Sequence, residues 1–111
     1  EMPNFKIGYW WVVYDDKEPV GFCGLTHVPS WDSAGYLNRG GMIHTHRGKG
    51  MQRRMINVRI KKARKVGWNW LVSATRENVP SSNNLIACGF KLYTPTFKWL
   101  DGHCLYWIRK I

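Results

Sequence analysis

The sequence predicts an α/β fold built on a mixed β-sheet, and three observations lead to that class. Runs rich in aromatic and β-branched residues, which are typical of strands, lie on both sides of one long stretch with helical periodicity at 50–66. A glycine loop joins this stretch to the preceding strand, and another apolar run follows it, as in a parallel strand pair with a crossover helix. With 111 residues, 44% of them hydrophobic, the chain can bury one core, so we expect a single domain over 1–111.

The first two strands are expected to form a β-hairpin. Residues 7–14 are mostly aromatic or β-branched, and they stop at a polar turn, 15–19, that contains two aspartates and a proline. Residues 20–25 then continue as the second strand.

A third strand is predicted at 36–44, after a polar connection at 29–35. The adjacent Gly40 and Gly41 within this strand indicate a bulge or a close backbone approach by a ligand. The strand leads directly into the glycine loop.

The crossover helix is predicted to pack one apolar face on the sheet. At helical spacing, that side carries Met51, Met55, Val58 and Val66, with Ile56, Ile60 and Ala63 beside them. The opposite side carries Arg53, Arg54, Lys61, Arg64 and Lys65. Gly67 ends the helix, because glycine is favoured just past a helix C-terminus.

The remaining elements are a buried strand at 68–75, a short helix and two further strands. Pro80, Ser81 and Ser82 open the short helix and Gly89 ends it, since serine is favoured at a helix start. The last strands are predicted at 91–94 and 104–111.

The charge distribution indicates an anionic ligand or partner. The formal net charge is +10, and nine of the seventeen Lys and Arg residues fall between Arg47 and Lys65, where no acidic residue occurs. A solvated helix face that maintains solubility is one explanation. An anionic cofactor, an acidic acceptor and nucleic acid are the others, and aromatic residues near a basic surface would allow base stacking.

Cysteine usage and the absence of targeting signals favour the cytoplasm. Cys23, Cys88 and Cys104 are odd in number and widely spaced, which argues against a disulfide framework and a structural zinc site. His44 and His46 lack a clear third ligand, so we predict no metal. The sequence has no 18-residue apolar run and no signal-peptide pattern, so no membrane partner is expected.

The loop before the helix has the composition of a phosphate-binding loop. Gly48 and Gly50 lie beside Arg47 and Lys49 and run directly into the helix start at Met51. Glycine lets the backbone approach an anion closely, and the first amides of a helix have no intrahelical acceptor. We therefore expect a pyrophosphate, or a similar group, at this loop.

Two motifs occur in the order and on the elements expected of one known family. The first is Arg or Gln, two variable residues, Gly, one variable residue, then Gly or Ala; the second is Asn-x-x-Ala/Ser, a short helix, and Gly-Phe. The first motif corresponds to Arg47, Gly50 and Gln52, with Met42 where Val is usual, and the second to Asn78, Ser81, Gly89 and Phe90. Residues 7–111 therefore resemble the GCN5-related N-acetyltransferase (GNAT) family, as a short member.

The resemblance implies acetyl-coenzyme A as cofactor and assigns residues to it. Arg47, Gly48, Lys49, Gly50, Met51 and Gln52 would bind its pyrophosphate. The strand edge at Met42 and Ile43 would pair with the pantetheine arm and offer an amide to the thioester carbonyl. Asn78 and Ser81 would contact the same arm.

The chain also departs from the family pattern. Gln52 replaces a small residue, the segment before Ile7 is too short for the first strand and two helices of relatives, and Leu85 occupies the position of the usual general-acid tyrosine. The resemblance therefore leads us to expect that these N-terminal elements are reduced, missing or replaced by a partner. For proton transfer the catalytic candidates are His44, Tyr36, Tyr93 and Ser82, with His27, Asp32 and Cys88 as further candidates and water as another acid.

The function that follows is acetyl transfer to an amine by direct attack. The acceptor class is open and includes a protein amino group, and a homodimer is an additional expectation. A catalytically degenerate binding protein of the same fold and a basic nucleic-acid-binding module are the alternatives.

Overall fold

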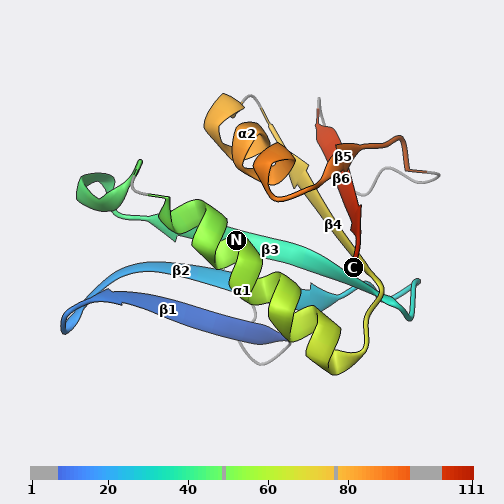
Figure 1. The fold of residues 1–111 in the computed structure, drawn as a ribbon, viewed down its shortest axis with the longest axis horizontal. Helices are drawn as coiled ribbons and strands as arrows, with labels where there is room; N and C mark the ends of the chain where they lie inside the picture. Colours follow the sequence, from blue (N-terminus) through green and yellow to red (C-terminus); the bar gives the residue numbers. More distant parts are fainter. Residues whose placement is uncertain (1–7, 49, 77, 96–103) are drawn as a thin grey trace.

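The computed structural model describes residues 8–48, 50–76, 78–95 and 104–111. They form one six-stranded mixed sheet in the order β1-β2-β3-β4-β6-β5, together with two α-helices (Figure 1). The strands are β1 (Tyr9–Asp15), β2 (Glu18–His27), β3 (Ala34–Met42), β4 (Trp70–Thr75), β5 (Lys91–Leu92) and β6 (Leu105–Lys110). The helices are α1 (Met51–Val66), α2 (Val79–Ala87) and the short 3-10 helix η1 (His44–His46).

The predicted α/β fold with a mixed sheet is confirmed. β1 and β2 form the expected antiparallel hairpin, and β2 pairs antiparallel with β3. β3 and β4 are parallel and are joined by α1, as the order strand, crossover helix, strand requires. β6 then pairs antiparallel with both β4 and β5.

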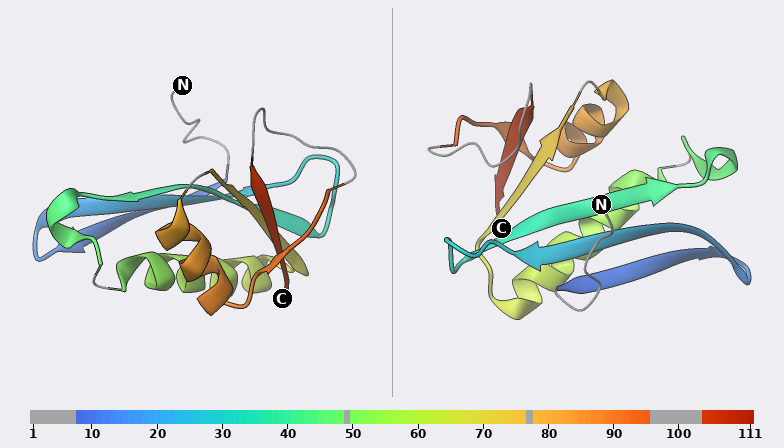
Figure 2. Two further views of the ribbon diagram at one scale, coloured as in Figure 1. Left: turned by 90° about the horizontal axis from the view of Figure 1, so that it is seen from above. Right: turned by 180° about the vertical axis from the view of Figure 1, so that it is seen from behind.

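Both α-helices lie on the same face of the sheet (Figure 2). α1 packs on β2 and β3 and also contacts α2. Gly67 ends α1 in the left-handed conformation, with φ 101°, and its amide bonds to the carbonyl groups of Ala63 and Arg64. The helix boundaries predicted from the glycines are therefore confirmed.

The core forms two buried clusters on the helix side of the sheet. The larger includes Leu25, Ile56, Ile60, Leu71 and Trp107, and the smaller consists of Val20, Cys23, Met42 and Met55. Cys88 packs against the larger cluster, as a core cysteine would.

Two residues of α1 that were predicted to face the sheet, Val58 and Val66, are exposed instead. Val58 is 44% exposed and Val66 is 38% exposed, whereas Arg59 is only 4% exposed. The reason is geometric, since the buried stripe runs through 55, 56, 59, 60 and 63, and position 58 turns away from the sheet.

The third strand is displaced from its predicted bounds. It starts two residues earlier and ends at Met42, after which the chain turns into η1, so His44 and His46 do not lie on a strand. The bulge predicted near Gly40 and Gly41 is confirmed, because Cys23 pairs with Gly40 and Gly24 pairs with Asn38, leaving one extra residue in β3. The segment before Ile7 lies outside the described residues.

Candidate functional site

The site begins where β3 and β4 part. The two parallel strands are paired only over three positions, from Ala34 with Trp70 to Tyr36 with Val72. β3 nevertheless continues to Met42 and β4 to Thr75. The carboxyl ends of the two strands are therefore separated, and such an opening between parallel strands is a common ligand site in α/β sheets.

A cavity of about 460 Å³ occupies this opening, and we call it the inner cavity. Residues from both separated strands and from both helices line it. They are Tyr36, Leu37, Asn38, Gly40, Gln52, Ile56, Arg59, Ser73, Ala74, Thr75, Ser81, Asn84 and Leu85.

A second cavity of about 790 Å³, the outer cavity, surrounds the glycine loop and the start of α1. Its lining includes His46, Arg47, Gly48, Gly50, Met51, Arg53 and Asn78. Gly40, Gln52, Ser81 and Asn84 line both cavities, so one cleft runs from the helix N-terminus into the gap between β3 and β4. An extended ligand with an anionic end fits this shape.

The glycine loop leaves the helix start open to an anion. Gly48 and Gly50 have φ values of 77° and 78°, a conformation that favours glycine, and a Cβ at either position would meet no atom within 4 Å. Gly50 is the N-cap, so no side chain caps the helix, and its first turn contains no acidic residue. The first amides and the positive end of the helix dipole thus face the outer cavity.

At the end of β3, the backbone N–H and C=O groups of successive residues point to opposite edges of the strand. The Ile43 amide donates to the Val20 carbonyl at 2.8 Å, so this amide is occupied within the sheet, and the cofactor contact predicted for Ile43 stays a prediction that would need another of its atoms. The N–H and C=O of one residue point to the same edge of a strand and those of its neighbour to the opposite edge, so the Met42 N–H faces the cleft instead. The Met42 carbonyl accepts a 3.1 Å bond from Arg47 Nε, which fixes the arginine at the rim of the outer cavity.

The start of α2 forms the opposite side of the cleft. Asn78 Oδ1 accepts a 3.0 Å bond from the Ser81 amide and caps the helix, which is worth about 1 kcal/mol in typical proteins. Asn78 lines the outer cavity and Ser81 lines both cavities. Met51 and Gln52 lie across from them at the start of α1, whereas Lys49 lies outside the described residues.

Two of the catalytic candidates lie at or near the inner cavity. Tyr36 is half-buried and lines it, at the point where β3 separates from β4. Ser82 lies on α2, and its hydroxyl is 3.1 Å from the hydroxyl of Thr75, which lines the inner cavity. Thr75 also accepts a 2.9 Å bond from Trp107 Nε1, so Ser82 belongs to a short polar chain behind the cavity wall.

The structure does not bring the other two candidates into the cleft. His44 is exposed on η1 and is absent from the lining of both cavities. Tyr93 lies beyond β5, next to Leu105 and Tyr106, and burial raises the pKa of its phenol to about 12, with a smaller contribution from Tyr106. A phenol with this pKa is a weak acid at neutral pH.

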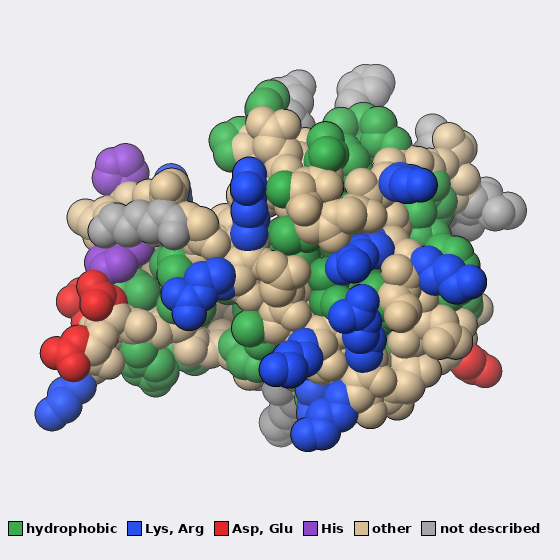
Figure 3. Space-filling model, in the orientation of Figure 1, with side chains coloured by type: hydrophobic (Ala, Val, Ile, Leu, Met, Phe, Trp, Pro, Cys, Tyr) green, Lys and Arg blue, Asp and Glu red, His purple; other side chains and the backbone are tan. Residues whose placement is uncertain are grey.

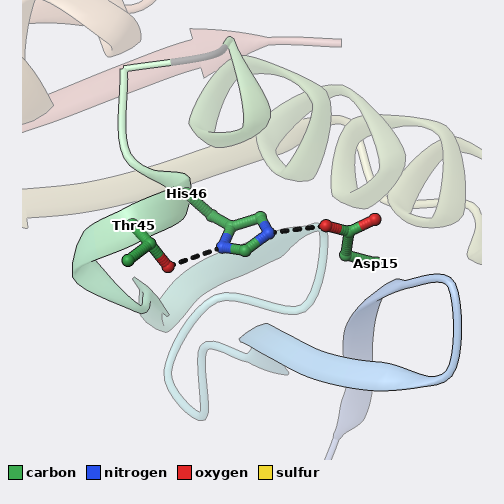
Figure 4. A network of polar contacts seen from close by, with 3 residues as sticks. All are labelled: Asp15, Thr45 and His46. Atoms are coloured by element: carbon green, nitrogen blue, oxygen red, sulfur yellow. Dashed lines mark hydrogen bonds and ion pairs between the residues drawn. The ribbon is translucent and has the colours of Figure 1, made fainter.

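His46 and His27 are held by contacts elsewhere. His46 Nε2 is 2.8 Å from Asp15 Oδ2 and its Nδ1 is 2.9 Å from the Thr45 hydroxyl, which ties η1 to the β1–β2 hairpin (Figure 4). His27 bonds to the Asp32 carbonyl at 3.0 Å and stacks on Trp68. These contacts give both histidines a structural role outside the proposed chemistry.

Arg59 is the residue of the site that sequence reasoning missed. It lines the inner cavity with 4% of its surface exposed, and burial lowers its pKa. The sequence did contain a signal that Arg59 faces the sheet. Arg59 lies four residues after Met55 and four before Ala63, within the apolar stripe of α1.

The basic face of α1 extends the positive charge beyond the cleft. Lys and Arg side chains are spread over the face that α1 presents in Figure 3. Arg53, Arg54, Lys61, Arg64 and Lys65 are exposed there, and Arg53 also lines the outer cavity and bonds to Asn84 Oδ1 at 3.0 Å. Part of the charge found in the sequence therefore belongs to the cleft.

A family model described as the acetyltransferase (GNAT) family matches residues 2–90. The chain therefore belongs to this family of acetyltransferases, as its motifs indicated. No curated protein sequence matches the chain. Within the described residues, no helix is both long and apolar enough to cross a membrane.

Solved structures share the fold at low sequence identity. A Bacillus subtilis acetyltransferase in complex with CoA has a TM-score of 0.82 and 13% identity, with 96% of this chain and 79% of that chain covered. The Salmonella typhimurium protein yncA, solved with its cofactor acetyl-CoA, has a TM-score of 0.75 and 17% identity, with 91% and 63% covered. The NatC complex bound to Gag peptide and CoA has a TM-score of 0.79 and 20% identity, with 92% and 70% covered.

Proposed function

We propose that the chain transfers an acetyl group from acetyl-coenzyme A to an amine acceptor by direct attack. One observation carries the proposal: the cleft that starts at an open helix N-terminus continues into the gap between two separated parallel strands. A long ligand with a pyrophosphate near one end and a reactive thioester at the other matches both parts of this cleft.

Different residues around the cleft would bind different parts of acetyl-coenzyme A. Gly48, Gly50 and the first amides of α1 would hold the pyrophosphate, with Arg47 beside them. The free edge of β3 at Met42 would bond the pantetheine arm, and its amide would polarise the thioester carbonyl. Positioning of this kind can supply roughly 7–11 kcal/mol of the barrier reduction.

The composition of the cleft supports direct attack over a covalent acyl-enzyme. Among the described residues, no cysteine lines either cavity, and Cys23 is buried in the smaller core cluster. His46 is the one histidine in these linings, and it already contacts Asp15 and Thr45. A paired nucleophile and base, which covalent catalysis requires, is therefore not supported.

Proton transfer would be handled by few groups. Tyr36 is the candidate base, or a relay to water, because it lines the inner cavity. Leu85 lines the same cavity in place of a phenol, and Ser82 reaches the cavity wall through Thr75. The proposal thus rests mainly on positioning and on electrostatic stabilisation.

The acceptor is proposed to be an amine, with protein amino termini among the classes to test. The NatC complex, which is similar in fold, was solved with a peptide. A cytoplasmic location and a homodimer stay predictions from the sequence.

Calorimetric titration of the purified chain with acetyl-coenzyme A tests the donor, and a micromolar dissociation constant is expected. Initial rates over a matrix of donor and amine concentrations test the mechanism. Converging double-reciprocal lines and no acetylated protein without acceptor are expected, whereas parallel lines with an acetylated cysteine would overturn direct attack. An amine screen that includes peptides with free amino termini would define the acceptor.

A further inference from the structure

Arg59 is a buried cation in the wall of the inner cavity. It projects from the middle of α1, and its side chain reaches across to β2 and β3. Nε donates to the Met55 carbonyl at 3.0 Å, and Nη1 donates to the carbonyl groups of Gly24 at 3.2 Å and Asn38 at 3.1 Å. Gly24 and Asn38 are paired at the β3 bulge, so one role of Arg59 is to hold that bulge.

These three bonds leave one end of the guanidinium for another partner. They use the donor of Nε and both donors of Nη1, so the two donors of Nη2 take part in none of them. Nη2 lies 3.8 Å from the position that a Cβ on Gly40 would occupy, and Gly40 and Arg59 both line the inner cavity. Among the described residues, no buried side-chain nitrogen or oxygen lacks a partner, which is consistent with an Nη2 that keeps some accessible surface on the Gly40 side of the cavity.

The cavity offers this cation no counter-ion. No Asp or Glu occurs among its described lining residues, and the three acceptors of Arg59 are neutral carbonyl groups. Cys23 on β2 and Cys88 after α2 are the ionisable neighbours of the guanidinium, and burial raises the pKa of both thiols and keeps them neutral. Tyr36 on β3 is the other titratable residue of the lining, and β4 contributes Ser73 and Thr75. A buried cation in this setting favours an anion supplied by a ligand.

Acetyl transfer generates such an anion. As the C–N bond forms, the C–S bond of the thioester breaks and its electron pair passes to sulfur, while the proton of the amine leaves to a base or to water. A group that protonates the sulfur would normally neutralise this charge. The family resemblance implies a tyrosine at position 85, whereas this chain has Leu85, which lines the same cavity as Arg59.

We propose that Arg59 is a catalytic residue that stabilises the departing coenzyme A thiolate through Nη2, in place of a general acid. This proposal rests on the proposed function, because it requires coenzyme A in the cleft. It explains why a charged side chain is buried within the apolar stripe of α1, where a neutral one would complete the core.

The test is the ionisation of the coenzyme A thiol bound to the wild-type protein. The thiolate absorbs in the ultraviolet, so a pH titration of the complex, with the desulfo-coenzyme A complex subtracted, reports the bound thiol. The three free cysteines of the protein cancel in this difference. A pKa about one to three units below that of free coenzyme A is expected, as for an acid beside an arginine. An unshifted or raised pKa would overturn the proposal.

Substitutions identify the source of the shift. Arg59→Met should abolish it, and Arg59→Lys should retain part of it. Arg64→Met removes an exposed cation of the same helix and should keep the full shift, whereas an equal loss in Arg64→Met would assign the effect to the general charge of the chain and overturn the proposal.

The experiment still gives an answer if a variant fails to fold, and its outcomes distinguish this proposal from the proposed function. If Arg59→Met does not fold, the wild-type titration and Arg59→Lys decide alone. If coenzyme A does not bind the wild type, both proposals fail, whereas binding with an unshifted thiol leaves the proposed function intact and refutes the role of Arg59.

Discussion

Replacing Gly50 with glutamate places a carboxylate at the mouth of the proposed pyrophosphate site. Gly50 is the N-cap of α1 with φ 78°, and its Cβ direction is open. Two unit charges about 4 Å apart repel by about 4 kcal/mol at an effective dielectric constant of about 20, which corresponds to roughly a thousandfold loss of affinity. We therefore expect Gly50→Glu to abolish measurable binding of acetyl-coenzyme A.

Gly50→Ala is the matched control, because it carries the same backbone strain without the charge. A side chain in the left-handed region costs about 1–2 kcal/mol, and a 111-residue chain loses about 4 °C of Tm per kcal/mol. The glutamate regains about 0.3–1 kcal/mol from the helix dipole at low salt. Gly50→Glu should therefore melt at or slightly above Gly50→Ala, yet bind far more weakly.

Thermal melts and calorimetric titration of the three proteins at low ionic strength measure both effects. If Gly50→Glu is folded and binds acetyl-coenzyme A as tightly as Gly50→Ala does, no pyrophosphate lies at this loop and the assignment of the outer cavity is wrong.

Three further predictions address the acid, the basic face and the buried phenol. Leu85→Tyr should raise single-turnover acetyl transfer more in an Arg59→Met background than in the wild type, because both groups would act on the same sulfur; additive effects would contradict this. Replacing Arg64 and Lys65 with glutamine should leave acetyl-coenzyme A affinity nearly unchanged at physiological salt, and a steep salt dependence of RNA or DNA binding that flattens in this variant would favour the nucleic-acid alternative. Because burial raises the pKa of Tyr93 from 10 to about 12, the unfolded state loses this proton first, so the free energy of unfolding should fall between about pH 10 and 12; Tyr93→Phe should show a smaller fall in denaturant titrations.

Local sequence patterns were enough for most of the elements. Gly50 and Gly67 mark the ends of α1 because their left-handed backbone disfavours other residues, and the Asn78 cap with Pro80 marks the start of α2. The hairpin, the parallel crossover and the phosphate-type loop followed from the same short-range rules, as did the family resemblance.

The cleft was less accessible to such patterns. Gly48, Gly50 and Asn78, which the sequence proposed as cofactor-binding residues, line the outer cavity, and each has a local signal: a left-handed backbone for the two glycines and a helix cap for Asn78. Tyr36 was one candidate among several, and only the separation of β3 from β4 distinguishes it from the exposed His44.

What the sequence by itself determined is the set of features written in neighbouring residues: strand and helix periodicity, caps, the glycine loop and the excess of positive charge. Tertiary structure decided which peptide groups remain free and which side chains meet. The Ile43 amide bonds to Val20 on another strand, and the Arg59 guanidinium is held by carbonyl groups that converge on it from β2 and β3. Both outcomes depend on contacts between residues more than twenty positions apart, and no local rule of spacing specifies such contacts.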